Sequence, residues 1–399
     1  MKLSGRARRL QPSATLAITA KAKQMRAEGI DVIGFGAGEP DFDTPAHIVD
    51  AAVDAVRAGD TRYTPVGGTP ELKKAICAAL ERDYGRRYEP AQVTVSCGAK
   101  HTLFNLFLAL LDEGDEVVVP APYWVSYPEQ IRVAGGTPVV VETREADGFR
   151  LTPQALEGAL TRRTRALVIN SPCNPTGAMY SREDLAALAE VLQGRDVLVV
   201  SDDIYHKLVY DGARFASLLH AAPDLSERVV VVNGVSKTYA MTGWRIGYAA
   251  GPAPLIQAME KLQSQSTSNP TSFAQKGAVA ALTGSQECVA QMVAAFEQRR
   301  QVLVDGLNGL PGVRCTLPQG AFYAFPNVSE LFGRRFRGEP LADSFAVARF
   351  FLDQARVAVV PGAPFGAEGH MRLSYATSLD AIREGIARMG AALDRLDPA

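Results

Sequence analysis

The sequence predicts an α/β protein with a large domain, a mostly parallel seven-stranded sheet between helices, and a smaller α+β domain formed by the N- and C-terminal segments. Seven runs rich in β-branched residues alternate with Ala- and Leu-rich stretches through the middle of the chain. This alternation favours a parallel sheet with helices on both faces. Beyond about Gly284 the pattern changes to one long amphipathic stretch and widely spaced short runs, which indicates a second unit.

Several of the seven candidate strands are almost continuously apolar, as in Val229–Val232. Such runs are typical of strands that are covered on both faces. Helices are expected between them, among others at Lys100–Leu111 and at Arg182–Leu192, where Ser181 is a candidate N-cap. The strands are Gln92–Ser96, Glu116–Val119, Pro138–Glu142, Ala166–Asn170, Val197–Ser201, Arg228–Asn233 and Arg245–Ala249.

The chain ends contain fewer elements. The N-terminal part predicts one helix, Ala17–Glu28, and one short strand, Val32–Phe35. The C-terminal part predicts a long helix, Glu287–Leu307, short strands near Ala321–Phe325, Val357–Val360 and Met371–Tyr375, and a last helix from Leu379. We therefore expect residues 1–45 to form an arm and part of the small domain, residues 46–284 the large domain, and residues 285–399 the rest of the small domain.

Composition excludes several classes of protein. The 399 residues carry 42 basic and 43 acidic side chains, a formal charge of −1, which argues against a nucleic-acid-binding protein. No apolar run is long enough to span a bilayer. The N-terminus is basic, but it has neither the Ser-rich stretch of a transit peptide nor the apolar core of a signal peptide. We therefore expect a cytoplasmic protein.

Metal and disulfide sites are also disfavoured. The five cysteines are scattered without a C-x-x-C pair, which is typical of free thiols in a reducing compartment. The five histidines form no H-x-x-x-H or H-E-x-x-H pair, so no metal site is expected.

Polar residues that can hold a cofactor follow five of the predicted strands. Ligands of open parallel sheets bind beyond the carboxyl ends of the strands. Each of these residues alone is common in a loop or at a helix cap, and their combination is what carries information. They are Ala99 and Lys100 at a helix start, Trp124, Asn174, Asp202 with Tyr205, and Lys237.

This set meets the needs of pyridoxal 5′-phosphate. That cofactor requires an amine for its Schiff base, a carboxylate that keeps its ring nitrogen protonated, and donors for its phosphate. Lys237 is the candidate amine and Asp202 the candidate carboxylate. Tyr205 and Asn174 can reach the ring 3-oxygen, and Trp124 can cover the ring face. The amides of Ala99 and Lys100, together with Ser236 and Arg245, can hold the phosphate.

A dinucleotide-binding fold is the rival interpretation. Glycines at 34, 36 and 38 follow a predicted strand, but Glu39 and Pro40 come next instead of a helix, and no G-x-G-x-x-G motif exists. Nicotinamide chemistry is therefore disfavoured.

Seven segments resemble known sequences. With them the chain resembles the class I/II aminotransferases of fold type I, which depend on pyridoxal phosphate, and most closely their bacterial aspartate aminotransferase subgroup. The similarity extends from about residue 9 to the last helix. The segments are 12–15 (PSAT), 37–42 (AGEPDF), 123–128 (YWVSYP), 174–177 (NPTG), 202–205 (DDIY), 236–247 (SKTYAMTGWRIG) and 372–377 (RLSYAT).

The resemblance implies the same roles for the strand-end residues and adds others. Lys237 would also move the substrate proton, while Gly38 and Arg372 would bind the substrate α-carboxylate beside Trp124 and Asn174. Tyr63 would reach the phosphate of the neighbouring subunit, which implies a homodimer with shared active sites. The partners implied are small-molecule substrates, an amino acid and a 2-oxo acid, with no nucleic acid and no membrane.

The resemblance also implies the substrate. A second carboxylate on the substrate needs its own cation, because burying an unpaired charge is costly. Lys100, Ser13 and Thr15 match the residues that hold the distal carboxylate in this subgroup. They favour aspartate as amino donor and 2-oxoglutarate as acceptor.

The sequence departs from the family's pattern at several positions, and alternative functions remain open. Gly234 stands where animal-type relatives carry a phosphate-binding Ser, and Cys97 and Cys173 occupy positions where small residues are usual; no catalytic thiol is expected. Gln11 replaces a basic residue that is associated with prephenate transamination, so weaker or absent prephenate activity is expected. The alternatives are an aromatic or prephenate (arogenate-forming) aminotransferase, a β-lyase, and a non-catalytic regulatory domain, which would usually carry a DNA-binding extension.

Overall fold

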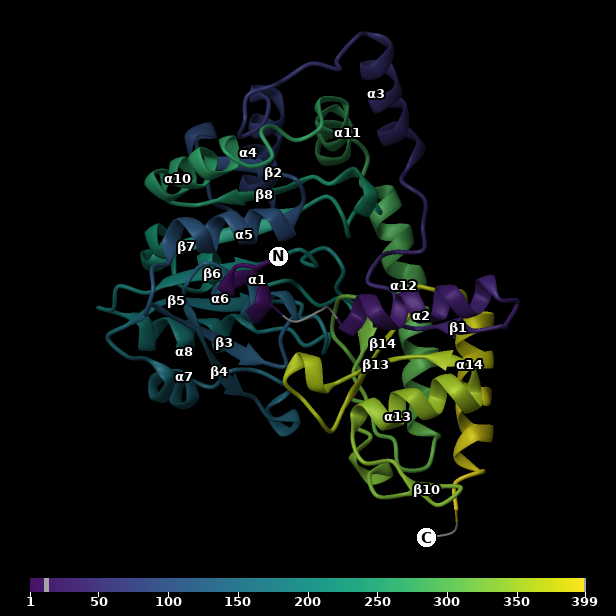
Figure 1. The fold of residues 1–399 in the computed structure, drawn as a ribbon. Helices are drawn as coiled ribbons and strands as arrows, with labels where there is room; N and C mark the ends of the chain where they lie inside the picture. The colour runs from purple at the N-terminus through teal and green to yellow at the C-terminus, as the bar shows by residue number, and fades with distance from the viewer. Residues whose placement is uncertain (11–13, 398–399) are drawn as a thin grey trace.

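A seven-stranded sheet forms the centre of the larger part of the molecule (Figure 1). The structure is a computed structural model that describes residues 1–10 and 14–397. All seven predicted strands are present, and the predicted fold class is confirmed. In spatial order they are β2 (Val93–Ser96), β8 (Gly247–Ala250), β7 (Val229–Gly234), β6 (Leu198–Asp202), β5 (Thr164–Asn170), β3 (Glu116–Ala121) and β4 (Thr137–Glu142).

The sheet is mostly parallel. The pairs β3–β4, β3–β5, β5–β6 and β6–β7 are parallel, whereas β8 runs antiparallel to both β2 and β7. The register places Asn170 beside Asp202 at the ends of β5 and β6. Two residues that the sequence places at strand ends therefore lie next to each other at one edge of the sheet.

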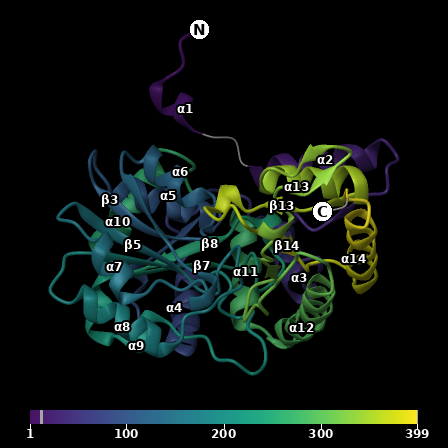
Figure 2. The same cartoon turned by 90° about the horizontal axis from the view of Figure 1, so that it is seen from below.

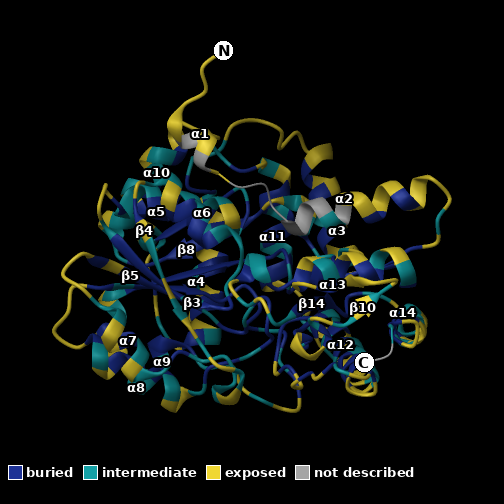
Figure 3. Ribbon diagram, turned by 60° about the horizontal axis from the view of Figure 1, so that its bottom comes forward, coloured by how far each residue is buried: buried dark blue, intermediate teal, exposed yellow. Residues whose placement is uncertain are grey.

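Helices cover both faces of this sheet (Figure 2). On one face, Leu72, Leu185 and Ala278 from three helices pack against buried strand valines; on the other, Leu103 and Ile256 do so. Figure 3 shows the inner strands as a buried layer, whereas the edge strand β4 has no buried residue. The helices of the first face are α3 (Ala46–Arg57), α4 (Pro70–Tyr84), α7 (Pro153–Ala159), α8 (Arg182–Leu192), α9 (Leu218–Ala221) and α11 (Ser272–Thr283), and those of the second are α5 (Ala99–Leu110), α6 (Ser126–Val133) and α10 (Ala253–Ser264).

A second core, with Phe35, Phe296, Phe322 and Leu373, lies among elements from both ends of the chain. Strand β1 (Ile33–Gly34) pairs with β12 (Val357–Ala358), so the N-terminal segment joins the C-terminal one. The domain boundaries remain a prediction. The other elements are α1 (Gly5–Arg9), α2 (Ala14–Ala27), α12 (Glu287–Asn308), β9 (Tyr323–Ala324), β10 (Arg335–Phe336), β11 (Glu339–Pro340), α13 (Ser344–Phe350), β13 (Val360–Pro361), β14 (Met371–Ser374) and α14 (Leu379–Leu393).

Two backbone features complete the fold. The peptide bonds before Pro122 and Pro172 are cis, both in loops that follow strands of the sheet. Among the described residues, no helix has the length and apolar character needed to cross a membrane.

Candidate active site

A cavity of about 320 Å³ opens at the carboxyl ends of β5 and β6. Twelve residues line it, and eight of them are residues that the sequence analysis selected. The predicted ones are Ala99, Lys100, Trp124, Asn174, Asp202, Tyr205, Lys237 and Arg245; the others are Leu103, Tyr127, Asn170 and Ile204.

Lys237 follows β7 and reaches the cavity from the loop after it. Its Nζ donates a hydrogen bond to the Gly38 carbonyl oxygen. Burial lowers the pKa of Lys237 to about 8, and repulsion from the nearby cations Arg372, Arg245 and Lys100 adds to this, while Glu39 opposes it. A lysine with this pKa is partly neutral near physiological pH and can act as a nucleophile.

Asp202 is the last residue of β6 and is buried. Its Oδ2 accepts a hydrogen bond of 2.6 Å from the Tyr127 hydroxyl, and its Oδ1 accepts one of 3.4 Å from the Ile204 amide. Burial raises the pKa of Asp202 to about 6, against the effect of these hydrogen bonds and of the Lys237 charge. The carboxyl is therefore mainly ionised at neutral pH, as a partner of a protonated ring nitrogen must be.

The start of α5 and Arg245 form an anion-binding corner. Gly98, the N-cap of α5, has φ of 88°, and a Cβ there would lie 2.3 Å from Arg245 Nη2. Arg245 is held by the carbonyls of Thr242 and Cys97 at 2.7 and 3.3 Å. The first amides of a helix have no partner within the helix and favour anions.

Two further positions bear on the phosphate site: Ser236, which was predicted to hold the phosphate, and Gly234, where animal-type relatives carry a serine. Ser236 is buried beside Lys237 but does not line the cavity. A Cβ on Gly234 would lie 2.9 Å from the Ile246 carbonyl oxygen, so this position has little room for a serine. The cavity as a whole fits pyridoxal phosphate. It combines an amine, a buried carboxylate, a helix start and an arginine.

Arg372 is a buried cation, 3% exposed. Its Nη1 donates to Asn174 Oδ1 at 3.0 Å and its Nη2 to the Gly36 carbonyl at 2.9 Å, while Nε has no partner. No carboxylate of the described residues lies within ion-pair distance. A buried charge without a counter-charge is costly, which indicates a place for an anionic ligand.

Lys100 is a second cation without an acidic partner in the described part of the chain. Its Nζ lies 5.0 Å from the centroid of the Trp124 ring. Partial desolvation, followed by repulsion from Arg245, lowers the pKa of Lys100.

The remaining predicted residues lie elsewhere or outside the described residues. Tyr63 is 91% exposed and does not line the cavity of its own chain. A Cβ on Gly38 would lie 3.5 Å from the Tyr323 hydroxyl. Ser13 and Gln11 lie outside the described residues, and Thr15 belongs to α2 with no description of its side chain.

Sequence reasoning did not select Tyr127, Asn170 or Tyr323. Asn170 Nδ2 donates to the Asp202 carbonyl at 2.8 Å, and Asn170 Oδ1 accepts from the Asn174 amide at 2.8 Å. Tyr323 Oη lies 2.9 Å from Tyr205 Oη. Asn170 and Tyr127 could have been selected from the sequence, because Asn170 ends a predicted strand and Tyr127 lies in segment 123–128, which resembles the family. Nothing in the sequence around Tyr323 indicated a place near the cavity.

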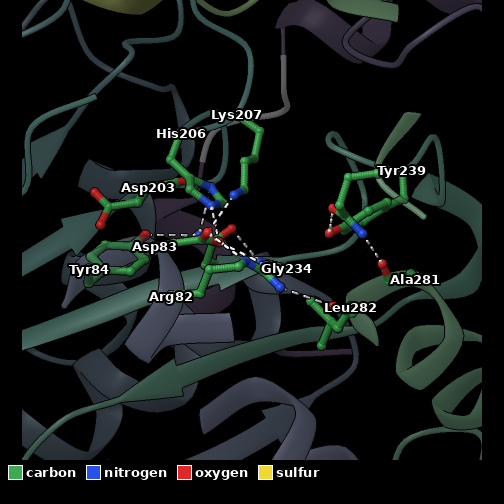
Figure 4. A network of polar contacts seen from close by, with 12 residues as sticks. Arg82, Asp83, Tyr84, Asp203, His206, Lys207, Gly234, Tyr239, Ala281 and Leu282 are labelled. Carbon is green, nitrogen blue, oxygen red and sulfur yellow. Dashed lines mark hydrogen bonds and ion pairs between the residues drawn. The ribbon is translucent and has the colours of Figure 1, made fainter. Parts of the chain in front are cut away.

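The segment that follows Asp202 at the end of β6 is held by Asp83 of α4, which contacts His206 and Lys207 (Figure 4). Asp83 pairs with Lys207 at 2.5 Å, with Arg82 at 3.0 Å and with His206 at 3.4 Å. Burial alone would raise the pKa of Asp83, but hydrogen bonds from these three side chains outweigh it and hold the pKa well below its usual range. The network anchors the segment that positions two cavity residues.

The comparisons agree with this geometry. The family model for aminotransferase class I and II matches residues 30–389. The chain belongs to this family. It is 55% identical over 389 residues to an aspartate aminotransferase of Geobacillus stearothermophilus, covering 98% of both chains. It is 51% identical to an aspartate/prephenate aminotransferase of Nitrosomonas europaea, covering 98% of this chain and all of the other.

The chain is also similar to solved structures of aspartate aminotransferases. The crystal structure of the aspartate aminotransferase from Rhizobium meliloti matches with a TM-score of 0.96 and 46% identity over the whole of both chains. The Thermus thermophilus aspartate aminotransferase with maleate matches with a TM-score of 0.92 and 44% identity, covering 98% of this chain and all of the other. The family, enzyme class and cofactor predictions are confirmed: this aminotransferase depends on pyridoxal phosphate.

Proposed function

We propose that this aminotransferase moves the amino group of L-aspartate to 2-oxoglutarate, giving oxaloacetate and L-glutamate. One observation carries the proposal: Lys100 lines the cavity, Arg372 is hydrogen-bonded to the lining residue Asn174, and neither cation has an acidic partner among the described residues. A dicarboxylic substrate supplies one carboxylate for each. The names of the relatives support it, and the Thermus thermophilus structure holds maleate, itself a dicarboxylate.

Pyridoxal phosphate supplies an electron sink for charge that develops on the substrate α-carbon. Asp202 would keep the ring nitrogen protonated, and Asn174 and Tyr205 would donate to the ring 3-oxygen. Trp124 would cover the ring face. The amides of Ala99 and Lys100, with Ser236 and Arg245, would hold the phosphate, to which Tyr63 of the neighbouring copy would add its hydroxyl.

Substrate binding and proton transfer follow from the same side chains. Arg372, with Gly38, Trp124 and Asn174 beside it, binds the α-carboxylate, and Lys100, Ser13 and Thr15 bind the distal one. Two anchored carboxylates fix the substrate so that its α-hydrogen faces Lys237 Nζ. With a pKa of about 8, Lys237 can take up this proton and return it, first for the amino donor and then for the 2-oxo acid.

The enzyme is proposed to act as a cytoplasmic homodimer. A hollow of about 780 Å³ beside the active site is lined by the apolar side chains Val49, Val53, Val56 and Phe273. Arg245 lines both this hollow and the active-site cavity. A second copy seated there would cover the apolar surface and bring its Tyr63 near the phosphate site.

The substrate is tested by single half-reactions. The loaded enzyme is mixed, without a 2-oxo acid, with aspartate, phenylalanine or arogenate, and the loss of the cofactor absorbance is followed. Aspartate is expected to react fastest. Lys100→Met is expected to lower kcat/KM for aspartate roughly tenfold to hundredfold, because a charge-assisted contact is lost, and to change that for alanine little. A faster reaction with phenylalanine or arogenate contradicts the proposal.

Prephenate transamination is a second candidate. Two relatives at 51% identity are named aspartate/prephenate aminotransferase. We expect weak prephenate activity because Gln11 lacks a positive charge for the additional carboxylate. Gln11→Lys is expected to raise kcat/KM for prephenate and leave that for aspartate unchanged. Efficient prephenate turnover by the unmodified enzyme contradicts this expectation.

A further inference from the structure

We propose that Tyr127 is a positioning residue whose hydroxyl keeps Asp202 ionised and oriented toward the ring nitrogen of the cofactor. The proposal rests on the roles given above to Asp202 and pyridoxal phosphate, and it does not depend on which amino acid is the substrate.

The geometry is that of a buried, dedicated hydrogen bond. Tyr127 lies in the first turn of α6 and is 2% exposed. Its hydroxyl lies 2.6 Å from Asp202 Oδ2, a length typical of a hydroxyl that donates to a carboxylate. The edge of its ring packs against Trp124 at a centroid distance of 5.3 Å and an interplanar angle of 81°. The side chain is therefore held in place from two sides.

The hydrogen bond also decides which Asp202 oxygen remains available. In the described part of the chain, Tyr127 donates to Oδ2, whereas Oδ1 has only the 3.4 Å contact with the Ile204 amide. Both Tyr127 and Asp202 line the cavity. The weakly engaged oxygen is the one that can pair with a ring N–H.

The other ionisable groups around Asp202 do not replace this effect. Among the described residues, Lys237 is the one cation near it, and it favours the carboxylate. Asp203 is an acid that repels it. Cys173 is partly buried and Tyr205 is buried; burial raises the pKa of both, so both are neutral. Within the described residues, the Tyr127 hydroxyl is the strongest hydrogen-bond donor to the Asp202 side chain.

The test follows the ring nitrogen directly. Enzyme loaded with ¹⁵N-labelled pyridoxal phosphate is titrated with pH and followed by NMR as unmodified protein, as Tyr127→Phe and as Tyr180→Phe. Tyr180 is the matched control, because its buried hydroxyl accepts from the Leu151 amide at 2.9 Å and is not bonded to Asp202. Tyr127→Phe is expected to shift the ring-nitrogen titration midpoint by about one pH unit, a tenfold change in proton affinity, and Tyr180→Phe to leave it unchanged.

Equal midpoints in the unmodified enzyme and Tyr127→Phe, or an equal shift in Tyr180→Phe, would overturn the proposal. Failure of aspartate to react would instead contradict the proposed function, since the ring nitrogen still titrates in that case. A second measurement makes the same change in the Asp202→Asn enzyme. There it is expected to leave cofactor affinity unchanged, because the hydroxyl acts through the carboxylate. A further loss of cofactor affinity in that background would overturn the proposal.

Discussion

Lys237 differs from an ordinary surface lysine because burial and three nearby cations lower its pKa to about 8. A neutral amine is required for attack on the cofactor aldehyde, and the neutral fraction grows as the pH rises through the pKa. We therefore expect the rate of covalent cofactor attachment to the cofactor-free protein to rise between about pH 7 and pH 9 and then to level off. Stopped-flow absorbance measures this rate directly.

The control for this measurement is Lys237→Ala, which should show no covalent attachment at any pH. A rate that keeps rising toward pH 10 or 11 would indicate that the lysine titrates like a solvent-exposed one and would contradict the expected environment.

The sequence predicted cavity residues well where they end or follow strands. Lys237, Asp202 and Asn174 follow apolar runs, and parallel strands bring their ends to one edge of a sheet. Tyr323 could not be found in this way, because it lies on a strand of two residues and meets Tyr205 across 118 positions. Arg372 was selected by resemblance, and the structure adds that it is buried without an acidic partner.

At the scale of elements, the seven sheet strands were predicted because β-branched runs carry their own signal. Helices α3, α4, α10 and α11 were not predicted. For α4 the signal existed: Thr69 accepts a hydrogen bond from the Leu72 amide as N-cap, Pro70 follows it, and Gly85 ends the helix in a left-handed conformation. The short strands β1 and β9 lie within the predicted runs Val32–Phe35 and Ala321–Phe325, but each has only two residues, so their bounds could not be predicted.

The start of helix α5 shows how a secondary-structure element positions the groups that bind the cofactor. Gly98→Ala would strain a position with φ of 88° and would push a Cβ toward Arg245 Nη2. We expect cofactor affinity to fall at least about tenfold, because Arg245 loses its place beside the helix start. Equilibrium titration of the cofactor-free protein with pyridoxal phosphate measures this.

Gly85→Ala is the control that separates backbone strain from displacement of the Arg245 side chain. Gly85 has φ of 63°, and no atom lies within 4 Å of a Cβ placed there. This variant is expected to lose about 1 kcal/mol of stability from backbone strain and to keep its cofactor affinity. Equal affinity loss in both variants would show that strain, and not the contact with Arg245, is the cause.

The whole molecule depends on contacts between segments far apart in the sequence. The pairing of Ile33 with Val357 joins the N-terminal segment to the C-terminal one. The sequence analysis expected these parts to pack together, but the register could not be read from two-residue strands. Likewise, Tyr63 has a role only across the proposed interface, and a single chain shows it merely as an exposed side chain.

The apolar hollow predicts how the molecule assembles. Val53 on α3 lies in this hollow and is 39% exposed in the single chain. Val53→Asp would bury an unpaired carboxylate between two copies, which is costly, so we expect the dimer to dissociate and transaminase activity to fall with it. Val140→Asp is the matched control, because Val140 is 43% exposed on β4, away from the hollow. Sedimentation velocity and activity at matched concentrations measure both effects. A Val53→Asp enzyme that remains dimeric, or an unmodified chain that is monomeric and fully active, would contradict a shared active site.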